Sequence, residues 1–149
     1  GCVLLDRGCS SGVTEWEIRI LIENHSQGTC LGVAAKPVVD ISYNGPSFYV
    51  YRAFNGALYR KGPEIEQGKQ RIYQGDTVRM RLDMDARTLE YWINDASQGV
   101  CFAGLEEDEL FPCVVFYSNG RAVELISVKS DTAPASAGGD GLVRAVGKP

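Results

Sequence analysis

Apolar and polar residues alternate along much of this chain with a period of two residues. The pattern is clearest in the segment 14–22 (TEWEIRILI). A threonine, a tryptophan and three isoleucines lie on one face, and the charged residues Glu15, Glu17 and Arg19 lie on the other. This period is typical of a β-strand with one buried face. The predicted buried face consists of Thr14, Trp16, Ile18, Ile20 and Ile22.

Three shorter runs are largely apolar on both faces, namely CLGVAA (30–35), SFYVYRA (47–53) and CVVFY (113–117), and they predict strands that are buried on both sides. Clusters of Gly, Asn, Ser and Asp separate the runs, as in DRGCSSG (6–12) and SYNGPS (42–47). No segment keeps a 3.6-residue apolar period over three turns. The chain is therefore predicted to be all-β, an antiparallel β-sandwich of two sheets.

The segment 76–95 (DTVRMRLDMDARTLEYWIND) is rich in acidic side chains but reads as a β-hairpin that turns about residues 85–88. We predict that Met84 lies opposite Leu89 and that Arg81 lies opposite Trp92, which allows a cation–π contact on the polar face. The predicted buried face consists of Val78, Met80, Leu82, Met84, Leu89, Tyr91 and Ile93.

The composition changes at Lys129, where a segment dominated by Ala, Gly, Ser and Pro begins and aromatic residues end. Such a segment buries too little apolar surface to offset its ordering entropy. We therefore predict one folded domain over residues 1–128 and a flexible linker or tail over 129–149. Because the chain begins at Gly1-Cys2 without a methionine, we expect it to be a piece of a longer protein.

The net charge and the cysteine content indicate which kinds of partner and which cellular compartment to expect. The net charge is −4, from 15 basic and 19 acidic residues without a basic run, so nucleic acid is not the expected partner. No run approaches the roughly 18 apolar residues that a membrane helix requires. The five cysteines form no C-x-x-C pair, which favours a reducing intracellular compartment, with the cytoplasm expected. We expect the isolated domain to be monomeric.

The sequence contains no recognisable catalytic, metal or cofactor motif. Its single histidine, His25, lies in a polar turn, and neither a G-x-S-x-G elbow nor a glycine-rich phosphate loop is present. The segment 83–94 also lacks the ligand spacing of an EF-hand. We therefore expect no enzymatic activity, no metal and no cofactor, although a hydrolase that pairs Asp83 with Glu90 remains an alternative.

Five motifs, read in order, resemble the SPRY domain family: SSGVTEWEIRI (10–20), CLGVAA (30–35), YRAFNGALYRKG (51–62), GDTVRMRLDMDARTLEYWIND (75–95) and FAGLEEDELFPCVVFYSNGRAVEL (102–125). The resemblance spans roughly residues 1–128 and implies a bent antiparallel two-sheet sandwich. It also implies a non-catalytic domain that recruits a protein or short peptide, including substrates of ubiquitin ligases, through loops at one end of the sandwich.

The positions that the resemblance assigns to partner binding lie in four loops. The tyrosine in the loop DISYNGPS (40–47) has the strongest independent case, because it has no strand face on which to be buried. In relatives that bind acidic-Asn peptides the last loop carries a bulky residue, and here a serine stands in its place. The implied partner-binding residues are Asp6, Arg7, Thr29, Tyr43, Tyr117, Ser118 and Asn119.

Two further functions are compatible with an all-β sandwich. A lectin-like domain would bind carbohydrate through loop residues such as Asn55, Asp95 and Trp92. A purely structural domain would instead rigidify a large scaffold. The sequence alone does not separate the structural role from the recruiting role.

Overall fold

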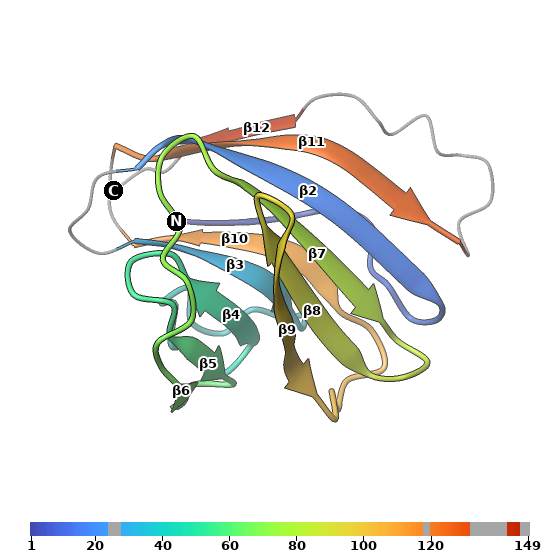
Figure 1. The fold of residues 1–149 in the computed structure, drawn as a ribbon. Coiled ribbons are helices and arrows are strands. Elements are labelled where there is room, and N and C mark those ends of the chain that lie inside the picture. The colour runs from blue at the N-terminus through green and yellow to red at the C-terminus, as the bar shows by residue number, and fades with distance from the viewer. Residues whose placement is uncertain (24–27, 118–119, 132–142, 147–149) are drawn as a thin grey trace.

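The computed structural model describes residues 1–23, 28–117, 120–131 and 143–146, and in these residues it contains two antiparallel six-stranded sheets that pack face to face (Figure 1). The described part contains no helix, and hence none that is long and apolar enough to cross a membrane. The predicted two-sheet sandwich is confirmed.

The strands of each sheet, in spatial order, are as follows. The first sheet consists of β1 (Cys2–Leu4), β10 (Phe111–Phe116), β3 (Thr29–Ala34), β4 (Phe48–Arg52), β5 (Leu58–Arg60) and β6 (Glu64–Glu66). The second sheet consists of β12 (Val143–Val146), β11 (Ala122–Ser130), β2 (Val13–Ile22), β7 (Thr77–Asp83), β8 (Thr88–Ile93) and β9 (Ala96–Ala103).

The main core lies between the two sheets and uses the faces that the alternation predicts. Trp16 is 1% exposed, and the buried alternating residues of β2, β7 and β8 join it in one cluster. Near the centre, the buried Tyr91 hydroxyl donates a hydrogen bond to the carbonyl oxygen of Leu31 on the opposite sheet (2.7 Å). This bond satisfies a polar group that burial would otherwise penalise by about 1–3 kcal/mol.

The prediction that Ile22 is buried is wrong, because Ile22 is 51% exposed. The pairing of β2 with β11 shifts at this point, with Ala122 opposite Ile22 and Val123 opposite Ile20. The extra residue, Leu21, forms a β-bulge that reverses the alternation. As a result, the Glu23 side chain turns inward.

The inward Glu23 carboxylate forms an ion pair with Arg121, whose Nε lies 2.5 Å from Oε1 of Glu23. Both side chains are almost fully buried, and the second carboxylate oxygen accepts the Thr29 N–H (3.1 Å). This buried ion pair ties the end of β2 to the start of β3 and to the start of β11. It therefore fixes these three chain segments relative to one another.

A second apolar cluster covers the outer face of the first sheet, so that this sheet is buried on both sides as predicted. Its buried members come from β3, β4, β5, β10 and the β4–β5 turn, and the loop 35–47 packs Val38 and Tyr43 against them. The members are Cys30, Ala34, Phe48, Val50, Ala57, Tyr59, Cys113 and Val115.

The β7–β8 hairpin has the predicted faces but a register that differs by two residues. Leu82 lies opposite Leu89 and Arg79, rather than Arg81, lies opposite Trp92. The turn begins one residue earlier than predicted because Asp83 Oδ1 accepts the N–H groups of Asp85 and Ala86, at 3.0 and 2.8 Å. An even shift leaves every side chain on its predicted face.

Pro112 is the second residue of β10. Its carbonyl oxygen accepts the Leu5 N–H at 2.9 Å, so its nitrogen faces the β1 side, where β1 has already ended at Leu4. The missing N–H of proline therefore costs no bond within the β1–β10 ladder.

Part of the predicted tail belongs to the second sheet. β11 continues to Ser130, two residues beyond the predicted end of the folded domain, and residues 143–146 form β12 alongside β11. β12 covers a strand edge that would otherwise present unpaired backbone groups. The remainder of the predicted tail beyond residue 131 lies outside the described residues.

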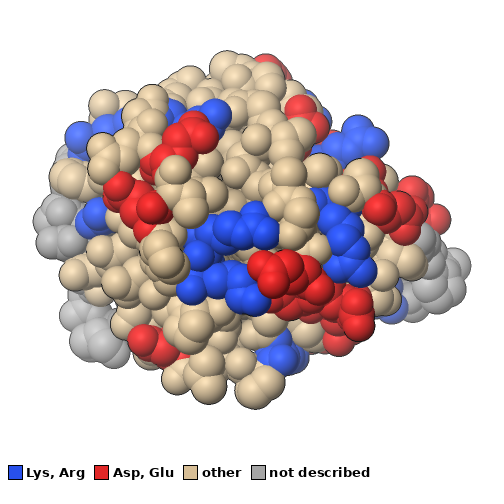
Figure 2. Space-filling model, turned by 90° about the horizontal axis from the view of Figure 1, so that it is seen from below, with Lys and Arg blue, Asp and Glu red and all other residues tan. Residues whose placement is uncertain are grey.

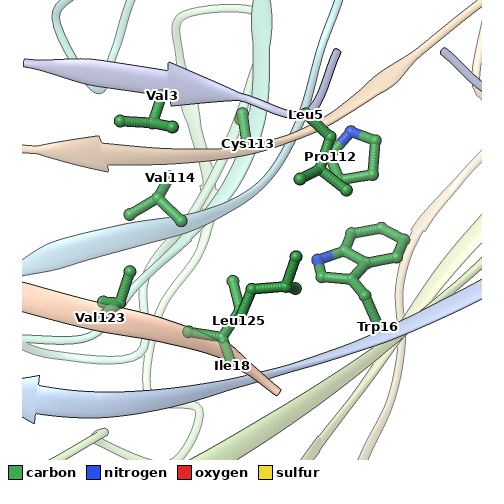
Figure 3. A pocket seen from close by; sticks show the side chains of 9 residues that line it. All are labelled: Val3, Leu5, Trp16, Ile18, Pro112, Cys113, Val114, Val123 and Leu125. Atoms are coloured by element: carbon green, nitrogen blue, oxygen red, sulfur yellow. The ribbon is translucent and has the colours of Figure 1, made fainter. Parts of the chain in front are cut away.

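A cavity of about 40 Å³ lies between the sheets where β1 and β10 face β2 and β11 (Figure 3). Its lining is apolar apart from the Trp16 indole N–H, which points toward the cavity and has no hydrogen-bond partner in the described structure. The lining residues are Val3, Leu5, Trp16, Ile18, Pro112, Cys113, Val114, Val123 and Leu125. Such a void removes packing contacts from its walls.

We expect Val114→Ile, which adds one methyl group to the cavity, to raise the free energy of unfolding by about 0.5–1 kcal/mol. This corresponds to a rise in Tm of roughly 1–4 °C, measurable by circular dichroism. Val50→Ile is the matched control, because Val50 is fully buried outside this cavity. The control is expected to be neutral or destabilising. Equal destabilisation by both variants would contradict the prediction that Val114 borders unfilled space.

We expect Arg121→Met to lower the free energy of unfolding by about 3–5 kcal/mol, because it leaves the Glu23 carboxylate buried without its cation. Urea denaturation measures the loss. Arg19→Met is the matched control, since the Arg19–Glu124 pair is 3.9 Å long and partly exposed, and its loss should cost less than about 1 kcal/mol. Losses of similar size in the two variants would show that the buried ion pair is not an anchor.

Candidate partner-binding site

Two of the predicted partner-binding residues, Tyr43 and Tyr117, lie together although 74 positions separate them in the sequence. Their ring centres are 5.1 Å apart, and Tyr43 also makes an edge-to-face contact with Tyr59 at 5.0 Å. Tyr59 is buried, whereas Tyr117 is 47% exposed. The tyrosine pair therefore packs against the outer cluster of the first sheet on one side and is exposed to solvent on the other.

The loop that carries Tyr43 is held by its own hydrogen bonds. The Asp40 carboxylate accepts the Ser42 N–H at 2.9 Å, and the hydrogen bond from Ser42 holds the pKa of Asp40 below its usual value. Gly45 donates its N–H to the Ser42 carbonyl oxygen at 2.8 Å. A Cβ at Gly45 would lie 2.5 Å from the Asp40 carbonyl oxygen, so the turn requires glycine. A pre-formed loop loses less entropy on binding.

Arg52, at the end of β4, links the tyrosine pair to a neighbouring aromatic ring. Its Cζ atom lies 5.0 Å from the Tyr43 ring centre, 5.2 Å from that of Phe54 and 5.9 Å from that of Tyr117. Beyond Phe54, Arg71 lies 4.9 Å from the same ring and 5.1 Å from the ring of Tyr73. We call this set the arginine–aromatic row: Tyr43, Tyr117, Arg52, Phe54, Arg71 and Tyr73.

The two halves of the row are joined where the β4–β5 turn meets the segment before β7. The Ile72 N–H donates a hydrogen bond to the Ala53 carbonyl oxygen at 3.0 Å, and both of these side chains are buried. Their sequence neighbours, Arg52, Phe54, Arg71 and Tyr73, are half-buried or exposed, so the row lies over this buried pair.

The other predicted partner-binding residues do not join this row. Asp6 and Arg7 are exposed but follow Leu5, which pairs with Pro112, so they lie roughly 16 Å from Tyr117, toward the opposite end of β10. Thr29 is fully buried and offers no side-chain surface to a partner. Ser118 and Asn119 lie outside the described residues.

Sequence analysis missed Arg52, Phe54, Arg71 and Tyr73. The first two fall within motifs attributed to the fold, and the other two follow a polar turn without strand alternation. No local pattern identifies them as neighbours, because their two segments are joined by long-range hydrogen bonds such as that from the Ile72 N–H to the Ala53 carbonyl oxygen.

The described part of the chain offers no catalytic centre. Burial raises the pKa of Cys30 and of Cys101 to about 12, and that of Cys2 to about 11. Burial likewise raises the pKa of Cys9 and Cys113, so all five thiols stay protonated at neutral pH and are poor nucleophiles. His25 lies outside the described residues. In the described ranges, no three His, Cys, Asp or Glu side chains gather as metal ligands.

The acidic pair considered for hydrolysis has structural roles. Asp83 Oδ1 caps the β7–β8 turn through two backbone N–H groups, and Glu90 lies opposite Arg81 in the ladder. Neither arrangement resembles two carboxylates that face each other across a cleft.

Two of the residues considered for carbohydrate binding, Trp92 and Asn55, are likewise engaged in contacts within the domain. The Trp92 ring is covered by the Arg79 guanidinium at 4.0 Å, and Asn55 Oδ1 accepts the Ala57 N–H at 3.1 Å. Asn55 lies in the β4–β5 turn of the first sheet, whereas Trp92 lies on β8 of the second sheet. The lectin interpretation therefore gains no support from their placement.

Charges of both signs are mixed on the face seen from below in Figure 2, where basic and acidic groups adjoin and neither forms a continuous patch. Opposite charges also pair within the domain, where Lys61 lies 2.9 Å from Glu107 and Glu107 accepts the Tyr49 hydroxyl at 2.7 Å. A phosphate backbone requires a continuous basic track, which this face lacks.

Comparison with known proteins agrees with this architecture. The SPRY domain family matches residues 13–129. The SPRY domain of human HERC1 is 33% identical, with a TM-score of 0.77 over 89% of this chain and 84% of that domain.

Two more distant solved structures share the fold, each with a TM-score of 0.64. The PSpry domain of TRIM65 is 21% identical over 85% of this chain and 70% of its own length. Another human SPRY domain is 20% identical over 83% of this chain and 82% of its own length.

SPRY domains are in general non-catalytic modules that bind proteins or peptides. The matched segment includes β2 to β10, β11 up to Lys129 and the whole arginine–aromatic row, so the resemblance noted in the sequence is confirmed. This chain belongs to the SPRY domain family.

Proposed function

We propose that this domain recruits a protein or peptide partner through the exposed side of Tyr43 and Tyr117, as part of a larger intracellular protein such as a ubiquitin ligase. The observation that carries the proposal is the contact of these two tyrosines with each other and with Arg52. Tyrosine and arginine are enriched among the residues that dominate binding energy at protein interfaces.

The rigidity of this surface supports a binding role. Tyr43 is buttressed by Tyr59 below and by Tyr117 beside it, and such aromatic contacts are worth about 0.5–1.5 kcal/mol each beyond the area they bury. The rings are therefore ordered before a partner arrives. An ordered aromatic anchor loses little conformational entropy when it is covered.

The cellular context is also a proposal. Five free cysteines suit a reducing compartment, which supports a location inside the cell and in the cytoplasm. The recruitment of ubiquitination substrates is suggested by the similarity to domains of HERC1 and TRIM65. Monomeric behaviour of the isolated domain remains a prediction.

We expect Tyr43→Ala and Tyr117→Ala to weaken capture of a specific partner from cell lysate by about 5- to 30-fold, because each removes a buttressed ring from the contact. Quantitative mass spectrometry of pull-downs with the isolated domain measures the effect. Val39→Ala is the matched control, since Val39 is 73% exposed in the same loop and is not among the rings of the tyrosine contact.

The control should retain every partner that the unmodified domain captures. Thermal unfolding of each variant shows whether the fold is intact, and Tyr117→Ala is the milder change because Tyr117 is the more exposed of the two rings. Retention of all specific partners by both tyrosine variants would rule out this surface.

A further inference from the structure

We infer that the arginine–aromatic row recognises an extended acidic peptide, with one carboxylate bound at Arg52 and a second, two residues away, at Arg71. This inference rests on the proposed function and specifies the chemistry of the partner. It extends the binding surface from the tyrosine pair across Phe54 to a part of the chain that sequence analysis left unassigned.

The first observation is the arrangement of the two guanidinium groups. Both Cζ atoms lie near the ring of Phe54, at 5.2 Å for Arg52 and 4.9 Å for Arg71. A guanidinium carries five N–H donors in a planar fork, so it can keep a hydrogen bond within the domain, as Arg52 does with Tyr59, and still bind a carboxylate. Such a fork matches the two oxygens of a carboxylate, in the bidentate geometry that a lysine cannot reproduce.

The second observation is the spacing. Because both Cζ atoms lie near the centre of one ring, they are within about 10 Å of each other. In an extended peptide, residues i and i+2 point to the same side and are roughly 7 Å apart. Two carboxylates separated by one residue lie within this limit and point to the same side, whereas adjacent acidic residues would point to opposite sides.

The third observation is the apolar surface beside the cations. Tyr117 and Tyr73 lie at the two ends of the row and are 47% and 48% exposed. Rings at these places exclude water from the carboxylate–arginine contacts, which strengthens such contacts. The row offers an anionic peptide the two positive charges of Arg52 and Arg71, and the carboxylates of Glu64 and Asp76 also lie beside it, at the Tyr59 hydroxyl and the Tyr73 N–H.

A fluorescein-labelled peptide, Gly-Glu-Val-Glu-Val-Glu-Gly, tests the inference by fluorescence anisotropy, with the same peptide carrying Gln for Glu as its reference. We expect the Glu peptide to bind at least about tenfold more tightly than the Gln peptide. We also expect this preference to shrink as the salt concentration rises from 0.05 to about 0.5 M.

Arg52→Gln and Arg71→Gln should each remove most of the preference for Glu, because each deletes one carboxylate contact. Arg71→Lys keeps the charge without the planar fork and should bind more weakly than the unmodified domain. Arg19→Gln makes the same change of charge on the second sheet, where Arg19 faces Glu124, and should leave binding unchanged.

Three outcomes would overturn the inference: no binding of the Glu peptide, equal binding of the two peptides, or an equal loss of binding in Arg19→Gln. Two separate arginine variants keep the test valid if one of them unfolds. Failure here leaves the proposed function standing if Tyr117→Ala still loses its partners, whereas the proposed function itself fails only if the tyrosine variants keep them.

Discussion

The outer face of the first sheet has to be buried, and the rest of the site depends on how this is achieved. β3, β4 and β10 are apolar on both faces, and only the inner face is covered by the second sheet. The loop 35–47 closes over the outer face and packs Val38 and Tyr43 there. Burial of the second apolar face thus places Tyr43 beside Arg52 at the end of β4 and beside Tyr117, which follows β10 and lies 74 positions away in the sequence.

A buried charge pair sets the other boundary of the site. The bulge at Leu21 turns Glu23 inward, and Arg121 and the Thr29 N–H satisfy its carboxylate. A buried carboxylate without these partners would cost several kcal/mol, so the three chain segments that supply them are held together. Tyr117 lies four residues before Arg121, close to this anchored end.

The proposed binding surface therefore packs directly on the hydrophobic core of this domain. The row that we propose for acidic peptides has its inward neighbours, Ala53 and Ile72, in the main core, while Tyr43 stands on the outer cluster. Core packing orders the rings and guanidinium groups before a partner arrives. The site needs neither a metal nor a deep cleft, because recognition of an extended peptide requires an ordered surface with charges at the correct spacing.

The class of fold, the family and the inward or outward direction of most strand residues could be predicted from the sequence, because they depend on a local period of two and on the order of motifs. The sequence did not determine the register of β7 and β8, the bulge at Leu21 or the burial of Thr29. Tyr43 was identified from its loop, yet its neighbours Arg52, Phe54 and Arg71 were not. Only the tertiary structure brought them together, because the strand order and the hydrogen bond between Ile72 and Ala53 join segments whose proximity no local pattern encodes.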